Sequence, residues 1–209
     1  MYKWLNPCIL ACVLASGCAS NTLKDPLSQY YYRNPEMDVR QVGPTVLLEL
    51  DNKTEYSRIS TDATDALFQA VQHSGLVGLS QIHAQDPGWK ELGLDDFEHY
   101  TLEQLSAIRK TLNCSAVLHG SVTRFSPYPH LTVGLRLRLI DLKSGLTHWA
   151  FEYIWDTADK ATLKRLDAFY TQKNMFGLTE SKDRLGYVSS IKFMKFVAHE
   201  TSLTLTTIE

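Results

Sequence analysis

Hydrophobic and polar residues alternate most regularly in the middle of the chain. From 131 to 139 every second residue is apolar, and the residues between them are polar or small; a second alternating segment covers 147–155. Alternation of this kind predicts strands with one buried and one solvated face. The sequence DLKSG at 141–145 is typical of a turn, with Gly145 where positive φ is needed. We therefore predict an antiparallel hairpin.

A period of 3.6 residues predicts two helices. In the first, at 62–73, one face carries Ala63, Ala66, Leu67, Ala70 and Val71. Ser60 or Thr61 is its expected N-cap. The second helix begins at a capping box formed by Thr101 and Gln104. Its expected inward residues are Leu102, Leu105, Ile108 and Leu112.

Shorter patterns complete the expected fold. Apolar runs predict strands at 44–50, 76–82 and 116–122. Helical patterns follow at 158–170 and 187–200, and the tail 202–208 fits either a frayed helix or a short strand. This order is typical of an α/β protein. We predict an α/β fold with a mixed sheet sandwiched by helices and an antiparallel hairpin near residues 131–156.

The N-terminal residues have the pattern of a signal peptide. Lys3 precedes an uncharged run at 8–15, which as a helix would span about 12 Å. A bilayer core is roughly 30 Å thick, so this run is too short to span it and fits a signal-peptide core instead. The sequence LASGC ending at Cys18 resembles the lipobox of bacterial lipoproteins, although Ala15 stands where leucine is usual.

We therefore expect cleavage before Cys18 and lipidation of its thiol, which would hold the chain on a membrane. A secretory signal with a chance cysteine is the alternative. In the lipoproteins that this sequence resembles, a residue such as Ala19 after the cysteine implies the outer membrane, facing the periplasm. The expected division is a signal peptide at 1–17, the lipidated cysteine and a flexible tether at 18–42, and a single α/β periplasmic domain at 43–209.

Within the tether, Tyr30, Tyr31 and Tyr32 form an aromatic run. They could contact a partner or a membrane, but we favour packing onto the domain. After cleavage, Cys114 is the one thiol not lost or lipidated, so no internal disulfide is expected. We expect Cys114 to be buried.

The formal net charge is −2, and no basic stripe is present in the sequence, so nucleic acid is not an expected partner. The seven histidines show no HExxH pattern or metal-ligand spacing, and neither GxSxG nor a nucleotide-binding glycine pattern occurs. We expect no catalytic residues, no metal and no cofactor.

Two segments carry a resemblance to known proteins, AVLHGSV at 116–122 and LRLIDLKSGLTHWA at 137–150. They resemble a family of bacterial envelope lipoproteins that includes CsgG, PelC and LpoB. Unlike CsgG, the chain has no spare pair of strands with lipid-facing alternation, so a pore is not expected. The resemblance implies a non-enzymatic protein that binds an envelope protein or associates with itself.

Candidate contact residues are aromatic. The stripe Trp149, Phe151, Tyr153 and Trp155 is expected to be core, but Tyr153 and Trp155 would contact a partner if exposed. Tyr128 lies in a loop that could also bind a partner. On the other face of the hairpin, Arg136 and Arg138 could pair with Glu152 or meet an acidic partner.

The leading hypothesis is therefore a lipid-anchored binding or scaffold module that contacts a secretion or cell-wall synthesis partner. The alternative is a periplasmic enzyme or small-ligand binder with a cleft near residues 86–99.

Overall fold

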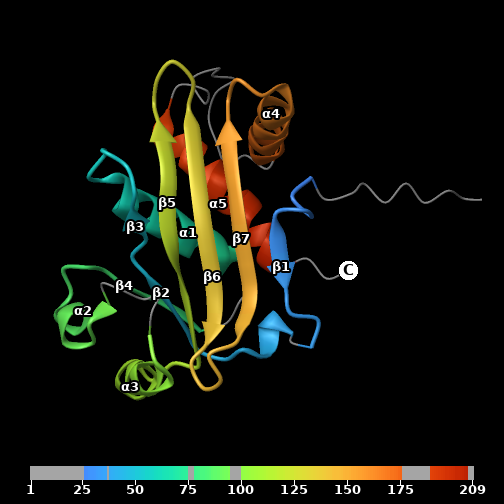
Figure 1. The fold of residues 1–209 in the computed structure, drawn as a ribbon. Coiled ribbons are helices and arrows are strands. Elements are labelled where there is room, and N and C mark those ends of the chain that lie inside the picture. The colour runs from blue at the N-terminus through green and yellow to red at the C-terminus, as the bar shows by residue number, and fades with distance from the viewer. Residues whose placement is uncertain (1–25, 37, 75–77, 95–99, 176–188, 207–209) are drawn as a thin grey trace, which may run out of the picture.

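The computed structural model describes residues 26–36, 38–74, 78–94, 100–175 and 189–206. In this part of the chain, seven strands form one mixed sheet that helices pack against (Figure 1). The strand order is β1-β7-β6-β5-β2-β4, and β3 pairs with β5. The predicted α/β fold with a mixed sheet is confirmed.

Three long antiparallel strands form the centre of the sheet: β5 (Ala116–Ser126), β6 (Thr132–Asp141) and β7 (Thr147–Asp156). The predicted hairpin is confirmed, with Val133 opposite Trp155 and Leu139 opposite Trp149. In the turn, Gly145 has a φ of 73°, a conformation that glycine adopts without steric cost.

Parallel pairing builds the other side of the sheet. The strand β2 (Thr45–Leu48) lies between β4 (Leu79–Ile82) and β5 and runs parallel to both. The short β3 (Asp51–Asn52) also runs parallel to β5. The sheet is therefore mixed because a parallel half joins an antiparallel half at β5.

The helices α1 (Ile59–His73) and α5 (Ser190–Thr206) cover one face of the sheet, which we call the inner face (Figure 1). The helix α4 (Lys160–Met175) packs beside α5. Apolar side chains from these elements and the inward residues of β5, β6 and β7 form the larger core. Because α5 extends to Thr206, the tail from 202 to 206 is helical.

The start of α1 differs from the prediction. The helix begins at Ile59, three residues earlier than expected, and its N-cap residue Arg58 makes no side-chain cap hydrogen bond. The Ser60 hydroxyl donates to the carbonyl of Leu50, and the Thr61 hydroxyl donates to the carboxylate of Glu49 at 2.8 Å. The predicted Ser60 or Thr61 cap is wrong, because both hydroxyls tie the helix to the segment after β2.

A second core lies on the opposite face, next to β2 and β4. It contains the helices α2 (Pro87–Glu91) and α3 (Leu102–Leu112), with Trp89 and Ile108 buried against the sheet. The capping box of α3 is confirmed, because Thr101 and Gln104 each accept a hydrogen bond from the other's backbone N–H. Leu102 does not point inward as predicted; it is 60% exposed.

The second half of the predicted flexible tether is part of the domain. The strand β1 (Tyr31–Arg33) pairs antiparallel with β7, which places Tyr31 opposite Phe151. A 3-10 helix at Val39–Gln41 follows, and Leu27, Val39 and Val42 are buried. The expectation of a tether to residue 42 is wrong for this stretch, because its apolar side chains join the core.

The remaining envelope predictions depend on residues outside the described part. The signal peptide, Cys18 and Ala19 all lie there. Among the helices that the structure describes, none combines the length and apolar character needed to cross a bilayer. The predicted burial of Cys114 is confirmed, since it is 4% exposed, and burial raises the pKa of its thiol to about 11.

Candidate partner-binding surfaces

The aromatic stripe of β7 belongs to the core, as favoured above. Trp149, Phe151 and Trp155 are at most 2% exposed. Trp155 is therefore inaccessible to a partner, so the suggestion that it is a contact residue is wrong. Its indole Nε1 instead donates a hydrogen bond to Glu200 on α5 at 2.6 Å. The fourth member of the stripe, Tyr153, is half-buried, with its ring centroid 4.5 Å from that of Tyr30.

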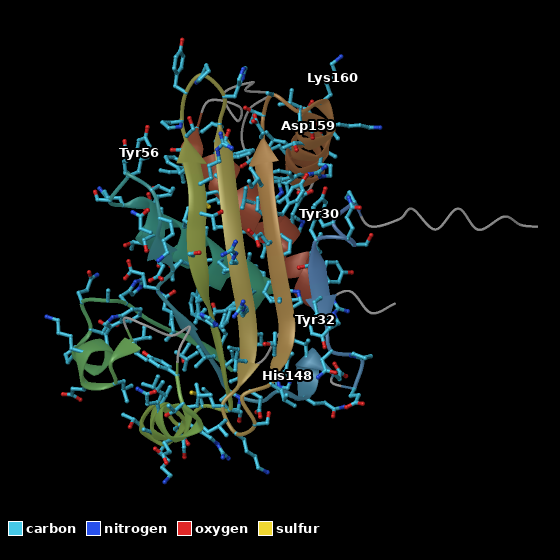
Figure 2. The ribbon with its side chains drawn as sticks, viewed as in Figure 1. Tyr30, Tyr32, Tyr56, His148, Asp159 and Lys160 are labelled. Atoms are coloured by element: carbon cyan, nitrogen blue, oxygen red, sulfur yellow. The ribbon has the colours of Figure 1, made fainter. Side chains whose placement is uncertain are left out.

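Tyr30 and Tyr32 border β7 along the β1 edge of the sheet (Figure 2). The favoured prediction that this run packs onto the domain is confirmed for Tyr31, which packs against the larger core, and for Tyr30. Tyr32 keeps 51% of its surface exposed. Tyr128, in the connection between β5 and β6, is 83% exposed and is therefore accessible to a partner. Its contact with a partner stays a prediction.

The face of β5, β6 and β7 that points away from α1 and α5 is open, and we call it the outer face. In Figure 1 the two helices lie behind these strands and leave this face towards the viewer. Its exposed side chains on the three strands include Arg124, Arg136, Arg138, Glu152 and Ile154. A protein can therefore approach the middle of the sheet from this side.

Arg136 and Glu152 pair across β6 and β7, which is one of the two possibilities that the sequence left open. The guanidinium donates twice to the carboxylate, from Nε to Oε2 at 3.0 Å and from Nη2 to Oε1 at 2.8 Å. Hydrogen bonding from Arg136 lowers the pKa of Glu152. Arg124 and Arg138 differ: within the described ranges, no carboxylate lies within ion-pair distance of either.

A β-bulge places Arg124 on the outer face. Val122 points inward, so strict alternation would turn Arg124 inward as well. The register shifts between Val122 and Arg124, which places Arg124 opposite Gly134 on the outer face. Phe125 then lies opposite Val133 and points to the inner face. Because a bulge inserts one extra residue, it reverses the direction of the side chains that follow. Arg124 was not predicted to lie on this face, because the strand was expected to end at residue 122 and a bulge leaves no fixed sequence pattern.

His119 lies under this charged surface. It is opposite Arg138 in the ladder and only 6% exposed. Burial and the nearby positive charge of Arg138 lower the pKa of His119 to about 4. His119 is therefore neutral at physiological pH.

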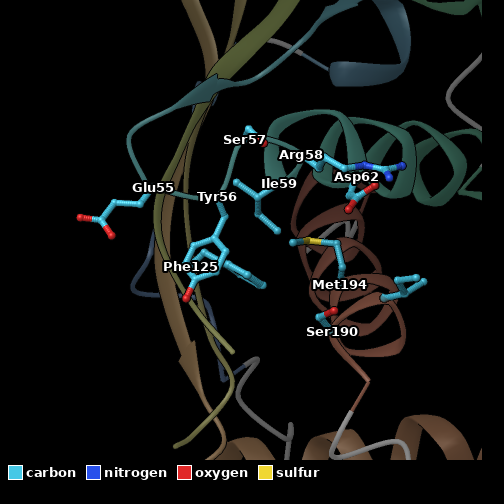
Figure 3. A pocket seen from close by; sticks show the side chains of 10 residues that line it. Glu55, Tyr56, Ser57, Arg58, Ile59, Asp62, Phe125, Ser190 and Met194 are labelled. Carbon is cyan, nitrogen blue, oxygen red and sulfur yellow. The ribbon is translucent and has the colours of Figure 1, made fainter. Parts of the chain in front are cut away.

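A groove of about 390 Å³ lies between the segment before α1 and the start of α5 (Figure 3). Its apolar wall includes Tyr56, Phe125, Ile59 and Met194, and the rings of Tyr56 and Phe125 meet edge to face at 4.9 Å. Glu55, Arg58 and Asp62 stand at its border. This groove could not be predicted from the sequence, because its walls come from segments more than 60 residues apart.

Polar side chains also meet at the carboxyl ends of the parallel strands β2 and β4. His83 Nδ1 lies 3.3 Å from Glu49 and its Nε2 lies 3.6 Å from Asp65. Burial would raise the pKa of Glu49, but hydrogen bonds from the Ala84 N–H and the Thr61 hydroxyl, with the nearby His83, lower it. In the described part of the chain, no group of three His, Cys, Asp or Glu residues is arranged to hold a metal ion. This cluster has the contacts of a structural network that joins β2, β4 and α1.

No protein-family model and no curated protein matches the sequence. Solved structures do match in fold. PelC from Paraburkholderia phytofirmans, solved as a dodecamer, superposes with a TM-score of 0.50 at 14% identity, covering 84% of this chain and 94% of PelC.

Two further structures are similar to smaller parts of the chain. A lipoprotein from Neisseria meningitidis has a TM-score of 0.40 at 14% identity, covering 65% of this chain and 99% of its own. The C-terminal domain of LpoB from Salmonella enterica has a TM-score of 0.41 at 20% identity, covering 54% and 82%. The chain has a PelC-like fold, as the sequence resemblance implied.

Proposed function

We propose that the chain is a lipid-anchored module of the bacterial envelope that binds a partner protein or a second copy of itself and catalyses no reaction. The open outer face carries this proposal. Antiparallel strands can keep one face solvated, which leaves that face accessible to a partner. Here β5, β6 and β7 leave one face to solvent, with exposed arginines and an isoleucine on it.

Two further observations support the proposal. The sequence around Cys18 resembles a lipobox, which would place the domain on the periplasmic face of the outer membrane. The PelC structure, whose fold this chain has, is a dodecamer, so the same fold supports assembly in that protein. A secretion or cell-wall synthesis protein is the partner that the sequence resemblance favours.

Cross-linking in intact cells tests this function. We expect a tagged wild-type chain to be captured with one or a few envelope proteins, or with itself, at a constant ratio. Cys18→Ala should reduce this capture, because an untethered domain is diluted away from a membrane-bound partner. A wild-type chain that stays monomeric and captures nothing above an unrelated lipoprotein would contradict the proposal.

The groove beside Tyr56 favours a second candidate, a binder of a small apolar ligand. Its volume of about 390 Å³ falls within the range of ligand pockets, and its walls are largely apolar. Native mass spectrometry of the protein isolated from cells distinguishes the two. A bound small molecule that Tyr56→Ala releases would support the second candidate.

A further inference from the structure

The outer face carries positive charge on a chain whose formal net charge is −2. Arg124, Arg136 and Arg138 project from its middle rows, and Glu152 is the one carboxylate that β5, β6 and β7 carry between Asp141 and Asp156, which lie at the strand ends. The acidic residues at the border are already engaged. Asp156 accepts a hydrogen bond from the Ala158 N–H at 2.7 Å, and Asp51 pairs with Lys53 at 3.3 Å.

The arginines follow the direction of the strands. Arg138 and Arg136 are two residues apart on β6, and Arg124 lies in the next row, beside Gly134. Rows on one face of a strand are about 7 Å apart, so the three side chains form a stripe about 14 Å long. An extended peptide with carboxylates at alternate residues has the same spacing. Guanidinium groups hold carboxylates through two parallel hydrogen bonds, as the pair of Arg136 and Glu152 does.

Apolar surface flanks the stripe. Ile154 is 46% exposed and lies opposite Gly134, where the absence of a side chain lets Ile154 and Arg124 pack closely over the backbone. Tyr32 is 51% exposed and lies opposite Ala150 at the edge of the sheet. Arginine and tyrosine are enriched among the residues that contribute most to protein interfaces. A contact with both charged and apolar parts fits a polypeptide better than a free anion.

We infer that the outer face binds an acidic, extended polypeptide segment of the partner, with carboxylates spaced to meet Arg124, Arg136 and Arg138. This inference rests on the proposed function and identifies the surface that carries it. An anionic membrane is the less suitable occupant, because segments that bind such membranes carry roughly four to eight Lys or Arg residues. The outer face has three arginines, and one of them is already paired with Glu152.

The test uses a labelled nonapeptide of alternating serine and glutamate and the full chain carrying Cys18→Ala, so that binding does not depend on anchoring. Peptide binding is followed by fluorescence anisotropy. A peptide with glutamine in place of glutamate controls for charge. Vesicles of phosphatidylcholine with about one-fifth phosphatidylglycerol, sedimented with the same chain, probe the membrane alternative.

Two double variants make the same change of charge on opposite sides of the sheet. Arg124→Glu with Arg138→Glu alters the outer face, whereas Lys164→Glu with Lys195→Glu alters exposed positions on α4 and α5. We expect the first to weaken peptide binding by about tenfold or more and the second by less than about twofold, because salt at 0.15 M screens charges beyond about 8 Å. Circular dichroism confirms that each variant is folded.

A third variant, Glu152→Gln, removes the carboxylate that competes with the peptide and should tighten binding. Equal losses in the two double variants, equal binding of the glutamine peptide, or no binding of the acidic peptide would each overturn the inference. Retention by the vesicles without peptide binding would overturn it in favour of a lipid surface. A failure of the peptide assay does not contradict the proposed function, because cross-linking in cells tests that function separately. Cross-linking captures a partner whichever surface it binds.

Discussion

His119 is a neutral base held beneath a positively charged sheet face. Its imidazole is almost fully buried, and Arg138 lies opposite in the ladder. Both burial and the arginine charge disfavour the protonated form, which lowers the pKa of His119 from 6.5 to about 4. The unfolded chain therefore binds a proton between these two pH values that the folded chain does not bind.

Stability should consequently fall with acid in this window. The contribution of His119 is fully present above pH 6.5 and is lost as the pH falls towards 4, by about 3 kcal/mol. In His119→Gln the position stays neutral, so the free energy of unfolding should fall less between pH 6.5 and 4. Urea unfolding at several pH values measures the difference.

His130→Gln is the matched control, because His130 is exposed in the connection between β5 and β6. It should retain the acid dependence of the wild type. His148 is also buried, and burial lowers its pKa, so a smaller acid dependence should persist in His119→Gln. If His119→Gln and the wild type lost stability in parallel, a titrating His119 would be ruled out.

At this scale the sequence predicted contacts that depend on local periodicity and missed those that depend on packing. The pair of Arg136 and Glu152 followed from counting alternate residues across a short turn. Trp155 was ambiguous because alternation shows which residues share a face but not which face a helix covers. Arg124 was missed because a bulge reverses alternation and has no fixed sequence signal.

Among the elements, α4, α5 and β7 are joined at one buried carboxylate. Glu200 on α5 accepts a hydrogen bond from Trp155 Nε1 at 2.6 Å and another from Arg165 Nε at 2.8 Å. Glu200 is only 8% exposed. Because each of its two partners comes from a different element, this carboxylate fixes both helices relative to the sheet.

Glu200→Ala should therefore destabilise the fold by roughly 3 kcal/mol or more, since it leaves the Arg165 charge and the indole N–H poorly solvated and unpaired. Urea unfolding followed by tryptophan fluorescence measures the loss.

Glu152→Ala removes the carboxylate of an exposed bidentate pair and should cost less than about 1 kcal/mol. If the two variants lost similar amounts of unfolding free energy, Glu200 would not hold the two helices to the sheet as described.

Elements set by neighbouring residues were the easiest to predict. The capping box of α3 and the turn between β6 and β7 need only a few residues in sequence. The strand β1 was missed because its pairing with β7 joins residues more than 100 positions apart. The start of α1 was misplaced because Ser60 and Thr61 bond to the segment after β2 rather than to their own helix.

For the whole molecule, the packing of β1 shortens the proposed tether. Leu27 is buried in the larger core, so eight residues, 19–26, lie between it and the proposed lipid site. Eight residues span at most about 28 Å. A domain anchored through Cys18 would therefore stay close to the membrane surface, and its partner must reach the outer face within that distance.

Intact mass spectrometry of the protein extracted from fractionated membranes tests anchoring at Cys18 most directly. We predict a chain that begins at Cys18, carries acyl chains on that residue and sediments with the outer membrane, while Cys18→Ala lacks the lipid mass and leaves the membrane. A wild-type chain with an unmodified Cys18 in the soluble fraction, or a Cys18→Ala chain with unchanged membrane partitioning, would contradict the proposed lipid-anchored function.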